Sequence, residues 1–167
     1  RFAIMAMDLA SGKTREVAPD WDRSAGPLKL SSDGRTLYTA ADELGQHPLF
    51  AIDIASGAST LIAGNGSVGE FDLADGTLAF TRDTLTSPAQ LFVRQPAGGA
   101  DRQVSVNNAE SLAKLAMGEA EQFHFTGAKG EKVYGYVVKP ANYQQGKTYP
   151  VAFLIHGGPQ GSFGNHF

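Results

Sequence analysis

The sequence contains no cysteine among its 167 residues. Disulfide bonds and zinc sites built on thiolates are therefore excluded, while the redox state of the compartment stays open. Long apolar runs are also missing: the longest uninterrupted one is FAIMAM at 2–7, whereas a membrane-spanning helix needs roughly 18 residues. We therefore expect no membrane as a partner.

Charge of one sign is not in excess either. The chain carries 14 Lys and Arg against 17 Asp and Glu, a formal net charge of −3. The basic residues are scattered singly, without the continuous stripe that follows a phosphate backbone, so we expect no nucleic-acid partner. With 42% hydrophobic and 19% charged residues, the composition is typical of a globular protein rather than a disordered one.

A repeated pattern is the main feature of the first hundred residues. MDLASGKTREV at 7–17 recurs 45 residues later as IDIASGASTLI at 52–62, and more weakly as FVRQPAGGADRQV at 92–104. Ahead of the two later copies stand LSSDGRTLYTA, from Leu30, and FDLADGTLAFT, from Phe71. Asp-Gly between alternating apolar runs predicts a β-hairpin, because glycine accepts a positive φ without a Cβ clash.

Each repeat therefore reads as four short strands: a strand, an Asp-Gly turn, a strand, a loop with Pro48 or Pro88, a strand, a glycine turn and a last strand. Four strands in roughly 40 to 45 residues are typical of a β-propeller blade. The fold class we predict is mixed, and residues 1–106 form the last two to three blades of a partial β-propeller. A β-sandwich is the alternative. So few blades cannot close a ring, and RFAIMAMDLASG at the start has neither an initiator methionine nor the form of a signal peptide. We therefore expect both ends of the chain to be cuts in a longer protein.

The pattern changes near residue 105. Residues 107–117 are predicted as a linker with a short helix, capped by Asn and with Leu112, Leu115 and Ala116 at helical spacing before Gly118 stops it. Three strands are predicted in the second domain, residues 118–167: EQFHFTG, KVYGYVVKP and YPVAFLIHGG. The third has the continuous apolar run of a fully buried strand.

Several tempting motifs fail in context. GNGSVG at 64–69 matches a dinucleotide fingerprint, but strand and turn follow it where a helix is required. Ser162 has Gln160 in place of the glycine that a nucleophile elbow needs. His47, His124 and His166 read as loop or surface residues. The histidines do not pair at metal-ligand spacing, and we expect no metal and no cofactor.

The corner HGGP, His156 to Pro159, has the right context for chemistry because a predicted buried strand delivers it to the edge of a sheet. Gly157 and Gly158 have no Cβ, so a backbone N–H can approach a substrate oxygen closely. Such an N–H, from the loop after the third strand, contributes to the oxyanion hole of acyl-transfer enzymes. The alternative is a glycine-rich turn without a catalytic role.

With AESLAKLAMGEAEQFHF, GEKVYGYVVKP and KTYPVAFLIHGGPQGSF following the repeats, the sequence resembles the prolyl oligopeptidase family of serine peptidases, most closely its dipeptidyl-peptidase V and acylaminoacyl-peptidase branch. The resemblance implies that residues 118–167 are the truncated N-terminal part of an α/β-hydrolase domain capped by the propeller. It implies an oxyanion-hole loop in which Gly158 supplies the amide while Gly157 and His156 shape the loop. Some relatives carry a tyrosine close to this corner whose hydroxyl assists the oxyanion, whereas the strand end here holds His156.

The resemblance also implies that the Ser, Asp and His of the catalytic triad lie downstream, so that no catalytic residue is present and this chain alone is inactive. The full-length protein would be a serine exopeptidase acting on short peptides, with a peptide substrate and the remainder of the same polypeptide as partners. A propeller-bearing esterase or lipase and a non-catalytic propeller binding module are the alternatives. A periplasmic or secreted location is favoured over a cytoplasmic one on the same grounds.

Overall fold

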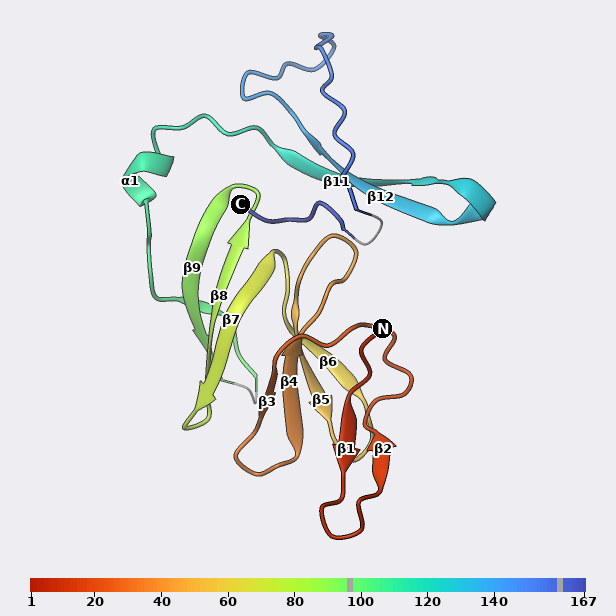
Figure 1. Cartoon of the computed structure of the whole chain (residues 1–167). Helices are drawn as coiled ribbons and strands as arrows, with labels where there is room; N and C mark the ends of the chain where they lie inside the picture. The colour runs from red at the N-terminus through yellow and green to blue at the C-terminus, as the bar shows by residue number, and fades with distance from the viewer. Residues whose placement is uncertain (96–97, 159–160) are drawn as a thin grey trace.

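The computed structural model describes residues 1–95, 98–158 and 161–167, and most of its regular structure is antiparallel strand (Figure 1). The strands that form the blade repeats are β1 Met5–Met7, β2 Thr14–Glu16, β3 Leu28–Leu30, β4 Thr36–Ala40, β5 Leu49–Asp53, β6 Ser59–Ala63, β7 Ser67–Ala74, β8 Thr77–Thr84, β9 Ser87–Arg94 and β10 Arg102–Gln103. The elements that follow are α1 Ala109–Leu112, β11 Ala120–Thr126, the 3₁₀ turn η1 Ala128–Gly130 and β12 Lys132–Val138.

The repeats form two four-stranded antiparallel sheets of the same topology. One has the order β3-β4-β5-β6 and the other the order β7-β8-β9-β10, each a meander of neighbouring strands. The separate hairpin β1–β2 is built like β5–β6, which carries the same sequence motif 45 residues later. The two sheets lie side by side without closing into a ring (Figure 1). The prediction of a partial propeller is thus confirmed.

Apolar side chains from adjacent sheets pack between them. One cluster joins Tyr38 and Leu49 of the first sheet to Val68, Leu78 and Phe80 of the second. Another joins the segments around β1 and β2 to the first sheet, and its members include Ile4, Val17, Trp21, Phe50 and Ile52. Within the strands, period-two alternation places pairs such as Leu78 and Phe80, or Phe50 and Ile52, on one face, so burial of the apolar faces stacks one blade on the next.

The predicted helix is shorter than expected. It ends at Leu112, none of its residues is buried, and Asn108 has a left-handed φ of 58° without a side-chain capping bond. A helix this short without a buried face gains little from packing, so Leu115 remains exposed. Gly118 is not a helix stop in this fold. A Cβ there would lie only 1.6 Å from the carbonyl oxygen of Lys139, so the residue permits the close approach that begins the β11–β12 sheet.

The prediction of a third, fully buried strand before the corner is wrong for the described residues. β11 and β12 pair only with each other, and no strand forms at 150–158. Val151, Phe153, Leu154 and Ile155 are 74% to 86% exposed. A buried strand needs hydrogen-bonding neighbours at its edges and apolar cover on both faces, and the described residues supply neither. The predicted domain division at residues 106 and 117 falls in the segment between β10 and β11 and stays a prediction.

Candidate active-site corner and its junction with the propeller sheets

The corner consists of His156, Gly157 and Gly158, and all three residues are exposed. Gly158 has a φ of +67°, the left-handed region that favours glycine. A Cβ on either glycine would meet no heavy atom within 4 Å, so the backbone here faces open space. Pro159, the last residue of the predicted motif, lies outside the described residues.

The backbone N–H groups of the corner glycines form no hydrogen bond with the described residues. Neither the N–H of Gly157 nor that of Gly158 donates to a described acceptor, while the Gly158 carbonyl accepts from the N–H of Gly161 at 3.2 Å. The ring of His156 lies edge-on to that of Phe163, with centroids 6.1 Å apart. Among the described residues, neither amide has an acceptor, and their assignment as oxyanion donors stays a prediction.

A cavity lies elsewhere, between the Asp-Gly turns of the two four-stranded sheets. Its volume is about 510 Å³, and its lining includes Ser31, Asp33, Tyr38, Leu73 and Asp75. No corner residue lines it. Within residues 1–95, 98–158 and 161–167, no cluster of three or more His, Cys, Asp or Glu side chains has the arrangement of a metal site. No helix in the described part of the chain is long and apolar enough to cross a membrane.

The β11–β12 sheet is joined to the propeller sheets through the loop between β4 and β5. The Tyr136 hydroxyl donates to the carbonyl of Gly45 at 3.1 Å and accepts from the side-chain amide of Gln46 at 2.7 Å. Gly45 has a φ of +76°, and a Cβ on it would lie 2.9 Å from the Tyr136 ring, so both the conformation and the close contact require glycine. Burial raises the pKa of Tyr136, which keeps its hydroxyl protonated as the donor to Gly45.

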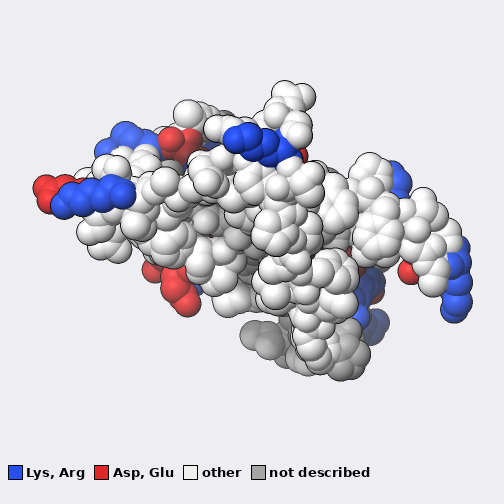
Figure 2. All heavy atoms as spheres, turned by 90° about the horizontal axis from the view of Figure 1, so that it is seen from above, with Lys and Arg blue, Asp and Glu red and all other residues white. Residues whose placement is uncertain are grey.

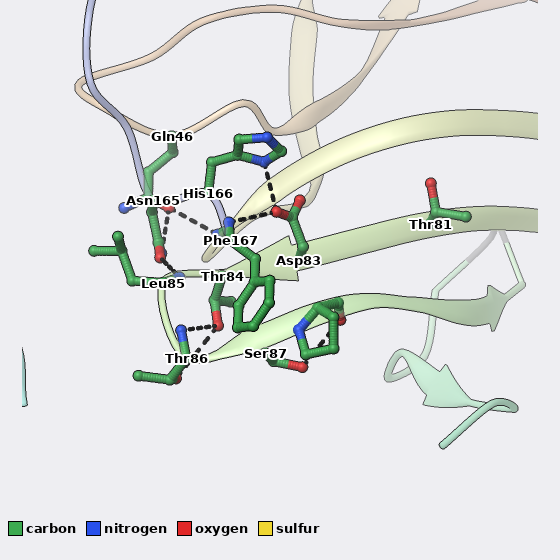
Figure 3. A network of polar contacts seen from close by, with 12 residues as sticks. Gln46, Thr81, Asp83, Thr84, Leu85, Thr86, Ser87, Asn165, His166 and Phe167 are labelled. Carbon is green, nitrogen blue, oxygen red and sulfur yellow. Dashed lines mark hydrogen bonds and ion pairs between the residues drawn. The ribbon is translucent and has the colours of Figure 1, made fainter. Parts of the chain in front are cut away.

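The segment that follows the corner, residues 164–167, is bound to two loops of the propeller sheets (Figure 3). The N–H of Asn165 donates to the Gly45 carbonyl at 2.7 Å, and its side-chain amide donates to Gln46 Oε1 at 3.0 Å. Asn165 Oδ1 accepts from the N–H of Leu85, in the β8–β9 turn, at 2.9 Å.

Asp83, near the end of β8, holds the last two residues of the same segment. Its Oδ2 accepts from the N–H of Phe167 at 2.7 Å and lies 2.5 Å from Nδ1 of His166 (Figure 3). The Asp83 side chain is only 9% exposed, whereas that of His166 is 70% exposed. An aspartate on histidine Nδ1 supplies two of the three members of a serine triad, but no described serine hydroxyl bonds to this imidazole. We therefore interpret the pair as an anchor for the segment.

Sequence reasoning missed Gln46, Asp83 and Asn165, and it treated His166 as an ordinary loop residue. Leu78 and Phe80 alternate along one face of β8, and Asp83 does not continue that alternation. The β8–β9 pairing is irregular between Arg82 and Thr84, beside Asp83. The one available signal was an acidic residue at a buried position near the end of the strand, out of phase with Leu78 and Phe80. The partners lie about eighty residues apart, so no local pattern connects them.

Comparison with known proteins gives consistent results, although no family model matches the chain. Over 175 residues, which include all of this chain, the sequence is 33% identical to a dipeptidyl-peptidase 5 of Arthroderma otae. The chain spans about a quarter of that relative, 24% of its length. Among solved structures, an acylaminoacyl peptidase in complex with Z-Gly-Gly-Phe-chloromethyl ketone is 29% identical, with a TM-score of 0.78, and the match covers 93% of this chain and 24% of the other.

The acylaminoacyl peptidase of Pyrococcus horikoshii is 27% identical with a TM-score of 0.75, over 93% of this chain and 24% of its own. These matches include the blade sheets and the elements after them, so they do not depend on the repeats alone. By its sequence and by its fold, the chain is similar to about a quarter of the dipeptidyl-peptidases 5 and of the acylaminoacyl peptidases, which supports the predicted resemblance to the prolyl oligopeptidase family.

Proposed function

We propose that this chain is part of a serine exopeptidase of the dipeptidyl- or acylaminoacyl-peptidase type, which hydrolyses short peptides through an acyl-enzyme. The observation that carries the proposal is the match of the whole chain to a dipeptidyl-peptidase 5, together with the likeness of its fold to acylaminoacyl peptidases. One of those structures holds a peptidyl chloromethyl ketone, which favours a peptide over a simple ester as the substrate class.

In this proposal the corner stabilises the transition state. When the nucleophilic serine attacks the scissile carbonyl, its oxygen becomes an anion, and the N–H of Gly158 donates a hydrogen bond to it. Gly157 and His156 shape the backbone that presents this N–H. An oxyanion donor of this kind is worth on the order of 3 kcal/mol in the transition state. The open amides and the left-handed φ of Gly158 support this role.

The proposal places the triad in the remainder of the same polypeptide, because the chain spans about a quarter of its curated relatives. The rest of the protein would also complete the propeller beside the exposed sheet edges and cover the apolar run Val151–Ile155. The completed propeller would then limit access to small peptides. Peptide substrate and the missing part of the polypeptide are thus the two partners proposed.

A fluorophosphonate probe that labels activated serines tests the proposal. We expect the longer protein that contains this chain to be labelled, and the 167-residue chain by itself to remain unlabelled. Hydrolysis of an aminoacyl-peptide amide in preference to a p-nitrophenyl ester then assigns the activity to peptides. A longer protein that takes no label under conditions where a known serine peptidase does would contradict the proposal.

A further inference from the structure

We propose that Asp83, near the end of β8, and Gln46, in the β4–β5 loop, are positioning residues that hold the active-site corner in place by anchoring the segment 164–167 after it. This inference rests on the proposed function and adds to it the residues that fix the corner. The two side chains make no contact with the corner itself, and they act through the chain that leaves it.

The Asp83 side chain contacts only this segment among its recorded polar partners. Its carboxylate is nearly buried, and both of its side-chain contacts, to Phe167 N–H at 2.7 Å and to His166 Nδ1 at 2.5 Å, are made with it. Burying a carboxylate without partners costs free energy. The bonds to Asp83 therefore favour the conformation in which residues 166–167 stay bound to the β8–β9 hairpin. Without those two residues, the Asp83 carboxylate would lose both of these partners.

Gln46 ties three elements together with one amide group. Its Oε1 accepts from the N–H of Gly66 at 2.7 Å and from Asn165 Nδ2 at 3.0 Å, and its Nε2 donates to the Tyr136 hydroxyl at 2.7 Å. The Gly66 bond fixes the Gln46 side chain within the propeller sheets. Its other two bonds then fix β12 and Asn165, which lie before and after the corner in the chain.

Asn165 completes the anchor by bridging the two loops. Its side chain accepts from Leu85 and donates to Gln46, while its N–H donates to Gly45. Figure 3 shows these bonds converging from the β4–β5 loop and from the β8–β9 turn onto one short segment. Every polar group of Asn165 named here thus points to a propeller loop.

The anchor matters because the backbone on the other side of the corner is not held by a sheet in the described residues. Residues 150–158 form no strand, and the corner glycines meet no neighbouring atoms within 4 Å of a Cβ position. An oxyanion donor has to sit within about 0.5 Å of its productive position. Only residues 159–163 separate Gly158 from the anchored segment 164–167, so the anchor limits how far the Gly158 amide can move.

The first test measures the anchor without reference to activity. In the longer protein, Asp83→Ala and Gln46→Ala should each raise the amide hydrogen-exchange rate of peptides covering 161–167 by about tenfold or more, since the anchoring bonds no longer protect them. Asp83→Asn keeps an acceptor for Phe167 and should raise it less. Asp72→Ala is the control, because Asp72 is an exposed aspartate of β7 that pairs with Lys29. Unchanged exchange in both anchor variants would overturn the inference.

The second test measures positioning. Asp83→Ala should lower kcat by about ten- to a hundredfold while KM changes less than about threefold, and Asp83→Asn should recover part of the loss. Asn165→Ala, which removes a side chain that belongs to neither apolar cluster, serves where an Asp83 variant fails to fold. Looser exchange with normal kcat in these variants would refute the positioning role. An unlabelled wild-type protein with a protected 161–167 would refute the proposed function and leave the anchor intact.

Discussion

At the scale of the residue, the same turn is built twice. Asp8 Oδ1 accepts from both the N–H and the hydroxyl of Ser11, each at 2.7 Å, and Asp53 accepts from Ser56 in the same way. The glycine that follows the serine has a positive φ in both copies, +70° at Gly12 and +75° at Gly57. The hydroxyl and the N–H lower the pKa of both aspartates, with the hydroxyl as the largest cause.

The first prediction concerns this turn. Ser56→Ala should raise the pKa of Asp53 toward its ordinary value of 3.8, because the hydroxyl donor is lost. A carboxylate with a lowered pKa stabilises the fold above its unfolded pKa, and the contribution disappears as the pH falls through the folded pKa. An NMR titration of the side-chain carboxyl measures the shift. Asp8, with Ser11 intact, is the internal control, and an Asp53 pKa that stays low would contradict the assignment.

A second residue-scale prediction compares two glycines that both have a left-handed φ. Gly76→Ala should cost roughly 1–2 kcal/mol, because its Cβ would meet no atom within 4 Å and only the conformation is strained. Gly57→Ala should cost roughly 1–3 kcal/mol more, since its Cβ would lie 2.6 Å from the Val17 carbonyl oxygen of the preceding hairpin. Urea unfolding of the two variants measures the difference, and equal costs would show that this contact can relax.

At the scale of the element, adjacent blades are joined by polar bonds as well as by their apolar faces. Arg94 of β9 donates to the carbonyl of Ile62 in β6 at 2.5 Å, and Arg82 of β8 donates to the carbonyl of Gly64 at 3.1 Å. Asp101 bridges both guanidinium groups, at 2.6 Å from Arg82 and 3.2 Å from Arg94. The three side chains are 17% to 21% exposed, so this charged cluster is largely shielded from water.

The prediction at this scale is that Asp101→Asn destabilises the stacked sheets by about 1–3 kcal/mol, because two shielded arginines lose their counter-charge. Asp22→Asn is the matched control. Asp22 is 87% exposed and pairs with Arg23 at the surface, where a pair is worth about 0–1 kcal/mol. Chemical denaturation of both variants separates the two cases. Equal denaturation midpoints would show that the Asp101–Arg82–Arg94 cluster does not stabilise the packing of the two sheets.

Elements that depend on local pattern were predictable, and those that depend on distant partners were not. The β3–β4 and β7–β8 hairpins follow from Asp-Gly turns between alternating residues, and both form as predicted. The run Val151–Ile155 has the composition of a buried strand, but composition cannot supply neighbours, and the run is exposed. The helix α1 forms within the predicted segment 107–117 but ends at Leu112, and none of its residues is buried.

At the scale of the whole molecule, the described surface combines open sheet edges with exposed apolar residues. The face in Figure 2 shows separated basic and acidic groups around a largely uncharged area, not a continuous patch of either sign. Phe153 and Ile155 are 80% and 75% exposed. Open edges and exposed apolar side chains favour association with further strands.

We therefore predict that the isolated chain self-associates at micromolar concentration. Replacing Phe153 and Ile155 by Lys should reduce the association by adding charge to the apolar run. Sedimentation velocity measures both effects. A stable monomer with native-like unfolding would instead favour an independent binding module over part of a larger enzyme.

The candidate site shows the same division between local and distant information. His156, Gly157 and Gly158 could be singled out because a glycine corner after an apolar run is a local pattern, and the left-handed φ of Gly158 agrees with it. The anchor could not, because Gln46 and Asn165 are 119 residues apart in the chain. Their meeting depends on how the blades direct two loops toward β12, which no short motif encodes.

The most direct measurement of the central claim is a crystal structure of the longer protein with a phosphonate covalently bound to its nucleophilic serine. We predict that the phosphonyl oxygen lies about 2.7–3.1 Å from the backbone nitrogen of Gly158. A separation beyond about 3.5 Å, or a Gly158 N–H donated to a protein carbonyl in that complex, would contradict the account.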